Sequence, residues 1–88
     1  MTVFVDTSAA YALLDRDDRV HAAARSRLER LLSDRESLLT SNYVVVETAA
    51  LVQTRLGVEA VRAFFSDLLP VLTIEWITPK DHHAAVTA

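Results

Sequence analysis

Short apolar stretches that suit β-strands alternate along this chain with longer stretches that have the periodicity of helices. Strands joined by helices form parallel sheets with helices packed on their faces. The sequence therefore predicts a three-layer α/β/α domain with a parallel sheet. Its strands are expected at Val3–Val5, Ser37–Thr40 and Val71–Ile77.

Helices are expected between these strands and after the last one. Ser41 or Asn42 is expected to cap the third helix, and Gly57 to end it. This helix is apolar around nearly its whole circumference, which predicts a central position in the fold. The sequence stops inside the last helix, so residues 1–88 are interpreted as the N-terminal two-thirds of one domain. The expected helices are Ser8–Leu14, Val20–Leu32, Tyr43–Leu56, Val58–Leu69 (stopped by Pro70) and a segment that opens at Pro79.

Composition narrows the class of protein. Apolar residues make up 51% of the chain, which is too many for a disordered segment. The sequence has no cysteine, so disulfides, thiolate metal sites and a thiol nucleophile are excluded. A net charge of −3 does not fit a protein that binds nucleic acid through a generally basic surface. No apolar run reaches the roughly 18 residues that cross a bilayer, and no signal-peptide pattern is present, which predicts a cytoplasmic protein with no membrane partner.

Asp6 is the first candidate for chemistry. It follows the first strand and precedes a helix, and open α/β sheets bind ligands at the carboxyl ends of their strands. A carboxylate there is expected to point into the crevice above the sheet. The alternative is that Asp6 only caps the helix that follows.

Glu47 is the second candidate, in the middle of the otherwise apolar third helix. No basic residue lies three or four positions away to pair with it. Burying an unpaired carboxylate is unfavourable unless a cation or a hydrogen-bond donor compensates. The alternatives are an ion pair with Arg27 or Arg55, or a position on an exposed edge of the helix.

Together the two acids predict a divalent-metal site, because both are expected above the same edge of the sheet. Mg²⁺ and Mn²⁺ prefer oxygen ligands and usually take one or two carboxylates from the protein. Such an ion can activate water and neutralise the charge that develops on a phosphodiester.

At these residues the sequence resembles the PIN-domain family, and within it the VapC-like toxin ribonucleases of bacterial toxin–antitoxin pairs. The opening block of that family is similar to VFVDTSAAYALLDRDDRVHAAA, with its strand-ending aspartate, Thr/Ser pair and short helix. Its second block is similar to LLTSNYVVVETAALVQTRLG, with a glutamate on a helix that ends in Arg-x-Gly. The resemblance covers essentially all 88 residues.

The resemblance implies a metal-dependent endoribonuclease that hydrolyses RNA phosphodiester bonds with Mg²⁺ (or Mn²⁺) held by three or four acids. Matching positions makes Asp6 and Glu47 the catalytic, metal-binding acids and gives Thr7 or Ser8 a supporting role. The third acid is expected after the helix that begins near Pro79, beyond this sequence. The implied partners are an RNA substrate, a cognate antitoxin protein and a second copy in a homodimer.

Two other functions stay open. The 88 residues can act as a binding module without catalysis, contacting an antitoxin or a second copy through Val58–Leu69. A phosphoryl-accepting domain with Asp6 as nucleophile fits less well, because Ser8 stands where the phosphatase-like pattern has a second aspartate.

The remaining polar residues have simpler explanations. The loop from Asp15 to Asp18 is expected to be solvated or to cap a helix, and His21 is expected to pack beside an apolar helix face. His82 and His83 are adjacent, so on a helix they diverge by about 100° and do not chelate one ion as an i, i+4 pair does.

Overall fold

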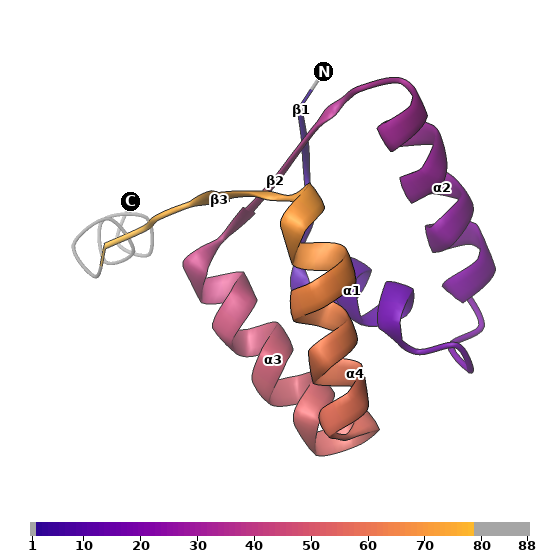
Figure 1. The fold of residues 1–88 in the computed structure, drawn as a ribbon, viewed down its shortest axis with the longest axis vertical. Coiled ribbons are helices and arrows are strands. Elements are labelled where there is room, and N and C mark those ends of the chain that lie inside the picture. The colour runs from indigo at the N-terminus through magenta and orange to yellow at the C-terminus, as the bar shows by residue number, and fades with distance from the viewer. Residues whose placement is uncertain (1, 79–88) are drawn as a thin grey trace.

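The computed structural model describes residues 2–78, which form an α/β fold with a three-stranded parallel sheet in the order β1-β2-β3. The chain leaves the carboxyl ends of β1 and β2 through α1 and α3 and returns through α2 and α4 (Figure 1). The predicted fold class is confirmed. The elements are β1 (Thr2–Phe4), α1 (Thr7–Leu14), α2 (His21–Ser33), β2 (Ser37–Ser41), α3 (Asn42–Leu56), α4 (Val58–Ala63), the π-helical η1 (Phe64–Leu68), the 3₁₀-helical η2 (Leu69–Val71) and β3 (Thr73–Glu75).

The helix boundaries follow local capping signals. Asp6 caps α1, since its side chain accepts a hydrogen bond from the backbone N–H of Ala9 at 2.9 Å. Ser41 rather than Asn42 caps α3, accepting from the N–H of Val44 at 3.2 Å. Gly57 ends α3 with φ of 91°, a backbone angle that side chains with a Cβ rarely adopt.

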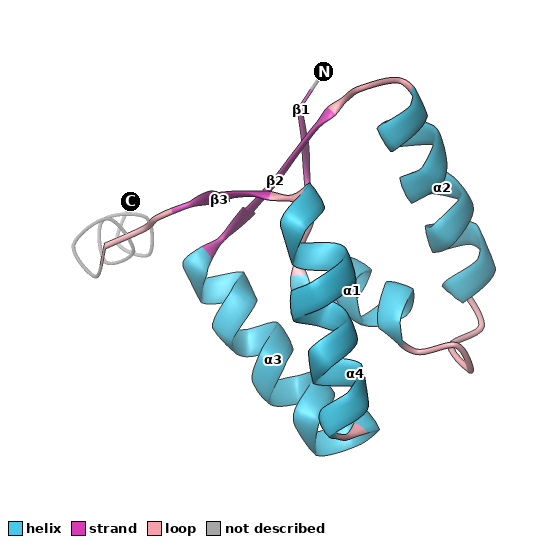
Figure 2. Ribbon diagram, in the orientation of Figure 1, coloured by secondary structure: helices cyan, strands magenta, loops and turns pink. Residues whose placement is uncertain are grey.

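The core lies between the helices and one face of the sheet. The segments α1, α2, α3, η1 and η2 contribute apolar side chains to the same cluster, so these helices cover a single face of the sheet (Figure 2). Phe4 points to the opposite face and is 52% exposed. Residues 2–78 contain no helical layer on the other face of the sheet, and the helix expected from Pro79 falls outside them. The buried members of the cluster are Val5, Ala10, Leu38, Phe64 and Leu68.

The position predicted for the third helix is wrong. Only Thr48 and Val52 of α3 are buried, while Val46 is 69% exposed. One side of α3 packs against α1 and α4, and nothing among residues 2–78 covers the other side. Although α3 is apolar around nearly its whole circumference, it does not lie at the centre of the described fold.

Two predicted boundaries also differ. The third strand pairs only over Thr73–Glu75. Val71 still belongs to η2, and after Glu75 the strand ends because β2 turns into α3 after Ser41. The fourth helix does not stop before Pro70. It passes from α4 into the wider turns of η1 and then into η2, which contains the proline near its start. Proline has no N–H to donate within a helix, which accounts for the change of helix type near this residue. Across residues 2–78, no helix has the length and apolar character that a bilayer span requires.

Candidate functional site

Asp6 stands at the carboxyl end of β1 and is exposed. Its Oδ1 accepts the hydrogen bond from Ala9, which fixes the orientation of the carboxylate. In the part of the chain that the structure describes, its other oxygen has no hydrogen-bond partner and the carboxylate has no ion-pair partner. Capping a helix and binding a ligand are therefore compatible roles for this side chain.

Glu47 lies in the first half of α3 and is exposed. The expectation that it is buried is wrong, and the alternative of a position on an exposed side of the helix is what the structure shows. Arg27 and Arg55 do not pair with it; the guanidinium of Arg55 instead lies 5.9 Å from the ring centroid of Tyr11. Within residues 2–78 the ion pairs join Arg25 to Glu29 and Arg62 to Glu59. The carboxylate of Glu47 is thus open to a ligand from solvent.

The sheet brings the elements that carry the two acids together. β1 and β2 pair in parallel, and Val5 donates its N–H to the carbonyl of Leu39 at 2.7 Å. Asp6 therefore leaves the sheet beside Ser41, the cap of α3. Glu47 follows Ser41 by less than two helical turns, about 9 Å along the axis at 1.5 Å per residue. α1 and α3 also pack against each other.

The supporting hydroxyls lie in the first turn of α1. Thr7 is half-buried and Ser8 is exposed. Neither hydroxyl bonds to Asp6 among the interactions of the described residues. Their supporting role stays a prediction.

The described residues supply only part of a metal site. Two exposed carboxylates without ion-pair partners fit the preference of Mg²⁺ or Mn²⁺ for oxygen. No group of three or more His, Cys, Asp or Glu residues in the described segment, 2–78, is arranged to hold an ion. Asp6 and Glu47 therefore fit an incomplete ligand set, and their assignment as metal ligands remains a prediction.

The other polar residues behave as the simpler explanations predicted. Asp15 and Asp18 accept hydrogen bonds from the backbone N–H groups of Asp17 and Val20, at 3.0 and 2.9 Å, which stabilise the loop between α1 and α2. The Nδ1 of His21 lies 2.7 Å from the carbonyl oxygen of Ala12, so this histidine is packed and hydrogen-bonded. The pair at positions 82 and 83 lies outside the described residues.

Sequence reasoning missed the role of Asn42. Its side-chain amide donates to the carbonyl of Ile77 at 3.0 Å and accepts from the N–H of Ile77 at 2.7 Å. The contact spans 35 positions. Only the polar amide at the start of an apolar helix could have drawn attention to it.

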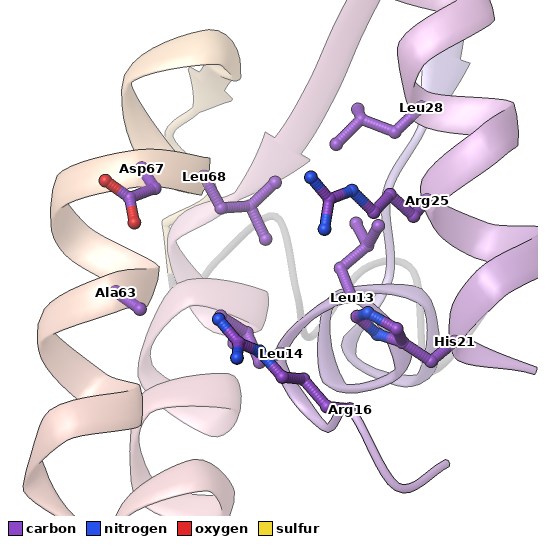
Figure 3. Close-up of a pocket in the computed structure, with 9 residues that line it drawn as sticks. All are labelled: Leu13, Leu14, Arg16, His21, Arg25, Leu28, Ala63, Asp67 and Leu68. Atoms are coloured by element: carbon purple, nitrogen blue, oxygen red, sulfur yellow. The ribbon is translucent and has the colours of Figure 1, made fainter. Parts of the chain in front are cut away.

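An open groove of about 340 Å³ lies away from the two acids, between α1, α2 and the α4–η1 segment. Figure 3 shows the guanidinium groups of Arg16 and Arg25 reaching into this groove, with Asp67 on the opposite wall. His21 lines it beside α1. The groove thus combines an apolar floor with mainly basic side chains. The apolar residues that line it are Leu13, Leu14, Leu28, Ala63 and Leu68.

Comparison with known proteins decides the family. The family model described as "PIN domain" matches residues 3–88. The chain belongs to the PIN domain family. No curated protein matches its sequence.

A solved structure agrees with this membership. The chain is similar to the crystal structure of Mycobacterium tuberculosis VapC20, a Sarcin-Ricin loop cleaving toxin, with 30% sequence identity and a TM-score of 0.77. The match covers 99% of this chain but 65% of the VapC20 chain. The chain therefore spans a little under two-thirds of that relative, and the resemblance to VapC-like toxins within the PIN domain family is confirmed.

Proposed function

We propose that this PIN domain belongs to a metal-dependent endoribonuclease, the toxin component of a toxin–antitoxin system that acts in the cytoplasm. The observation that carries the proposal is the placement of Asp6 and Glu47. Each is exposed and without an ion-pair partner in the described segment, and they lie on elements that leave the carboxyl ends of neighbouring parallel strands. The similarity to VapC20, a Sarcin-Ricin loop cleaving toxin, supports RNA as the substrate.

Asp6 and Glu47 are the residues that would hold Mg²⁺ (or Mn²⁺), together with a third acid outside residues 2–78. When bound, such an ion supplies an activated water and offsets the charge that develops on the phosphodiester. Asp6 is oriented for this role by its bond to Ala9, because the cap leaves one oxygen available. Thr7 and Ser8, in the first turn of α1, would then support the site by donating hydrogen bonds to a phosphate oxygen.

Cleavage of RNA by the full-length protein tests the proposal. We expect cleavage with Mg²⁺ or Mn²⁺, none with EDTA, and a loss of at least about 100-fold for Asp6→Asn and for Glu47→Gln. Asparagine caps helices as well as aspartate does, so Asp6→Asn removes the charge and leaves α1 intact. Glu29→Gln, which removes an exposed acid on α2, is the matched control and should cleave normally. Full activity of Asp6→Asn would exclude the assignment.

The groove favours an antitoxin as the protein partner. Its floor is apolar, and Arg16 and Arg25 reach into it. An amphipathic segment with apolar and acidic side chains complements such a surface. This interaction would persist if the chain acted as a binding module without catalysis. Leu28→Asp should abolish co-elution with the antitoxin from a neighbouring gene, and unchanged co-elution would contradict this assignment.

A homodimer is the second proposed association. Val58 and Phe65 are 57% and 47% exposed and lie two helical turns apart on the α4–η1 segment. Side chains seven positions apart recur on one face of a helix. Sedimentation should show a dimer that Val58→Asp dissociates; a monomer in the unsubstituted protein would rule the dimer out.

A further inference from the structure

The only tryptophan of the chain, Trp76, follows directly after β3 and is 76% exposed. Ser41 pairs with Glu75 in the β2–β3 register, so Trp76 leaves the sheet at the level of Asn42. This is the edge of the sheet from which Asp6 and α3 also emerge. Two spacings between neighbouring strands, about 10 Å in all, separate the lines of β1 and β3.

The backbone that carries Trp76 is held in place. Among residues 2–78, β2 offers no further backbone partner to Trp76 and Ile77, because it has become α3. The side-chain amide of Asn42 supplies the donor and the acceptor instead, and it binds both polar groups of Ile77. The indole is therefore exposed on an anchored segment.

A second aromatic side chain links this segment to the proposed catalytic acid. Tyr43 follows Asn42, is 39% exposed, and precedes Glu47 by four positions on α3. Residues four apart on a helix lie on the same side, about one turn from each other. Glu47 and Tyr43 on α3 are therefore tied to Trp76 through the Asn42–Ile77 contact at the carboxyl edge of β2 and β3.

We propose that Trp76 and Tyr43, here called the aromatic pair, bind unpaired bases of the RNA substrate by stacking next to Asp6 and Glu47. This inference rests on the proposed nuclease function. Aromatic side chains stack on any base, and this mode of binding suits single-stranded RNA. With a net charge of −3 the chain is poorly suited to hold RNA by phosphate contacts alone. Stacking supplies affinity that does not depend on a basic surface.

Binding can be measured without cleavage in the protein that carries Asp6→Asn and Glu47→Gln. These substitutions remove two acids that repel RNA phosphates and also remove the proposed metal ligands. The probe is a fluorescein-labelled, single-stranded hexaribonucleotide, followed by anisotropy. We expect Trp76→Leu to weaken binding about tenfold, as the loss of one stacked base does, and Trp76→Phe to retain most of the affinity. Tyr43→Leu and Tyr43→Phe should show the same contrast.

Trp76 is the single tryptophan among these 88 residues, so the tryptophan fluorescence of this chain reports on this position. In the Asp6→Asn, Glu47→Gln protein, unlabelled hexaribonucleotide should quench this emission. The RNA concentration that gives half of the quenching should match the dissociation constant found by anisotropy. Equal RNA affinity of Trp76→Leu and Trp76→Phe, or binding without quenching, would overturn the proposal. A Trp76→Leu protein with unchanged RNA affinity but altered sedimentation would identify a protein interface instead. Failure of the nuclease function itself is read separately, from the cleavage assay on the unsubstituted protein.

Discussion

The hydroxyl of Thr40 donates a buried hydrogen bond to the carbonyl of Val5 at 2.9 Å, joining β2 to β1 one residue before Ser41 and Asp6. Thr40 is 1% exposed, so water does not replace this bond if it is lost. The contact therefore fixes the relative position of the two chain segments that lead to the proposed site.

Thr40→Val should lower the free energy of unfolding by about 1–3 kcal/mol, because the buried carbonyl of Val5 loses a partner while the side-chain shape is kept. The measurement is urea denaturation followed by circular dichroism. Thr54→Val is the matched control. The hydroxyl of Thr54 bonds to the carbonyl of Ala50 at an exposed site, where water can replace it. Equal effects of the two substitutions would contradict the structural importance of the Thr40 bond.

Asn42→Ala should destabilise the chain by about 1–3 kcal/mol, since both polar backbone groups of Ile77 lose their partner at a half-buried site. Increased hydrogen exchange at the N–H of Ile77 should accompany this loss. Gln53→Ala, which removes an exposed amide from the same helix, should change stability by less than about 0.5 kcal/mol. Unchanged exchange at Ile77 in Asn42→Ala would show that the contact does not hold the segment.

Local signals made much of this fold predictable. Asp6, Ser41 and Gly57 act through backbone groups within a few residues, so their roles as helix boundaries could be inferred from the sequence. The parallel sheet followed from strands separated by helices. These features depend on neighbours along the chain rather than on distant contacts.

The rest depended on contacts between distant segments. The apolar composition of α3 did not reveal that one of its sides is uncovered in the described fold, so Glu47 was wrongly expected to be buried. Asn42 binds Ile77 across 35 positions, and this contact sets how the chain continues after β3. The closeness of the elements that carry the two acids was predictable only as far as the order of strands allowed, because the ladder between β1 and β2 decides which helix starts lie side by side.

Asp6 should have two separable roles. Asp6→Ala removes the cap on α1 and should lower the free energy of unfolding by about 1 kcal/mol, whereas Asp6→Asn should change it by only a few tenths. Both should reduce Mn²⁺ binding, measured by electron paramagnetic resonance of the free ion, because both remove a negative oxygen ligand. Mn²⁺ binding by Asp6→Asn at the affinity of the unsubstituted protein would leave Asp6 as a helix cap only.

The salt dependence of RNA binding should be shallow if the aromatic pair carries much of the affinity. Each phosphate neutralised by a basic side chain contributes about −0.7 to the slope of log K against log salt for single-stranded nucleic acid. Stacking releases no counterions, so the Asp6→Asn, Glu47→Gln protein should show a slope of about −2 or shallower with the hexaribonucleotide. Trp76→Leu should lower the affinity at every salt concentration without changing that slope.

Arg55→Gln is the control for charge. It removes a cation from the last turn of α3, where the guanidinium lies over Tyr11 of α1, and it should leave the affinity within about twofold. A slope of about −4 or steeper, or one that Trp76→Leu alters, would show that phosphate contacts rather than stacked bases dominate binding.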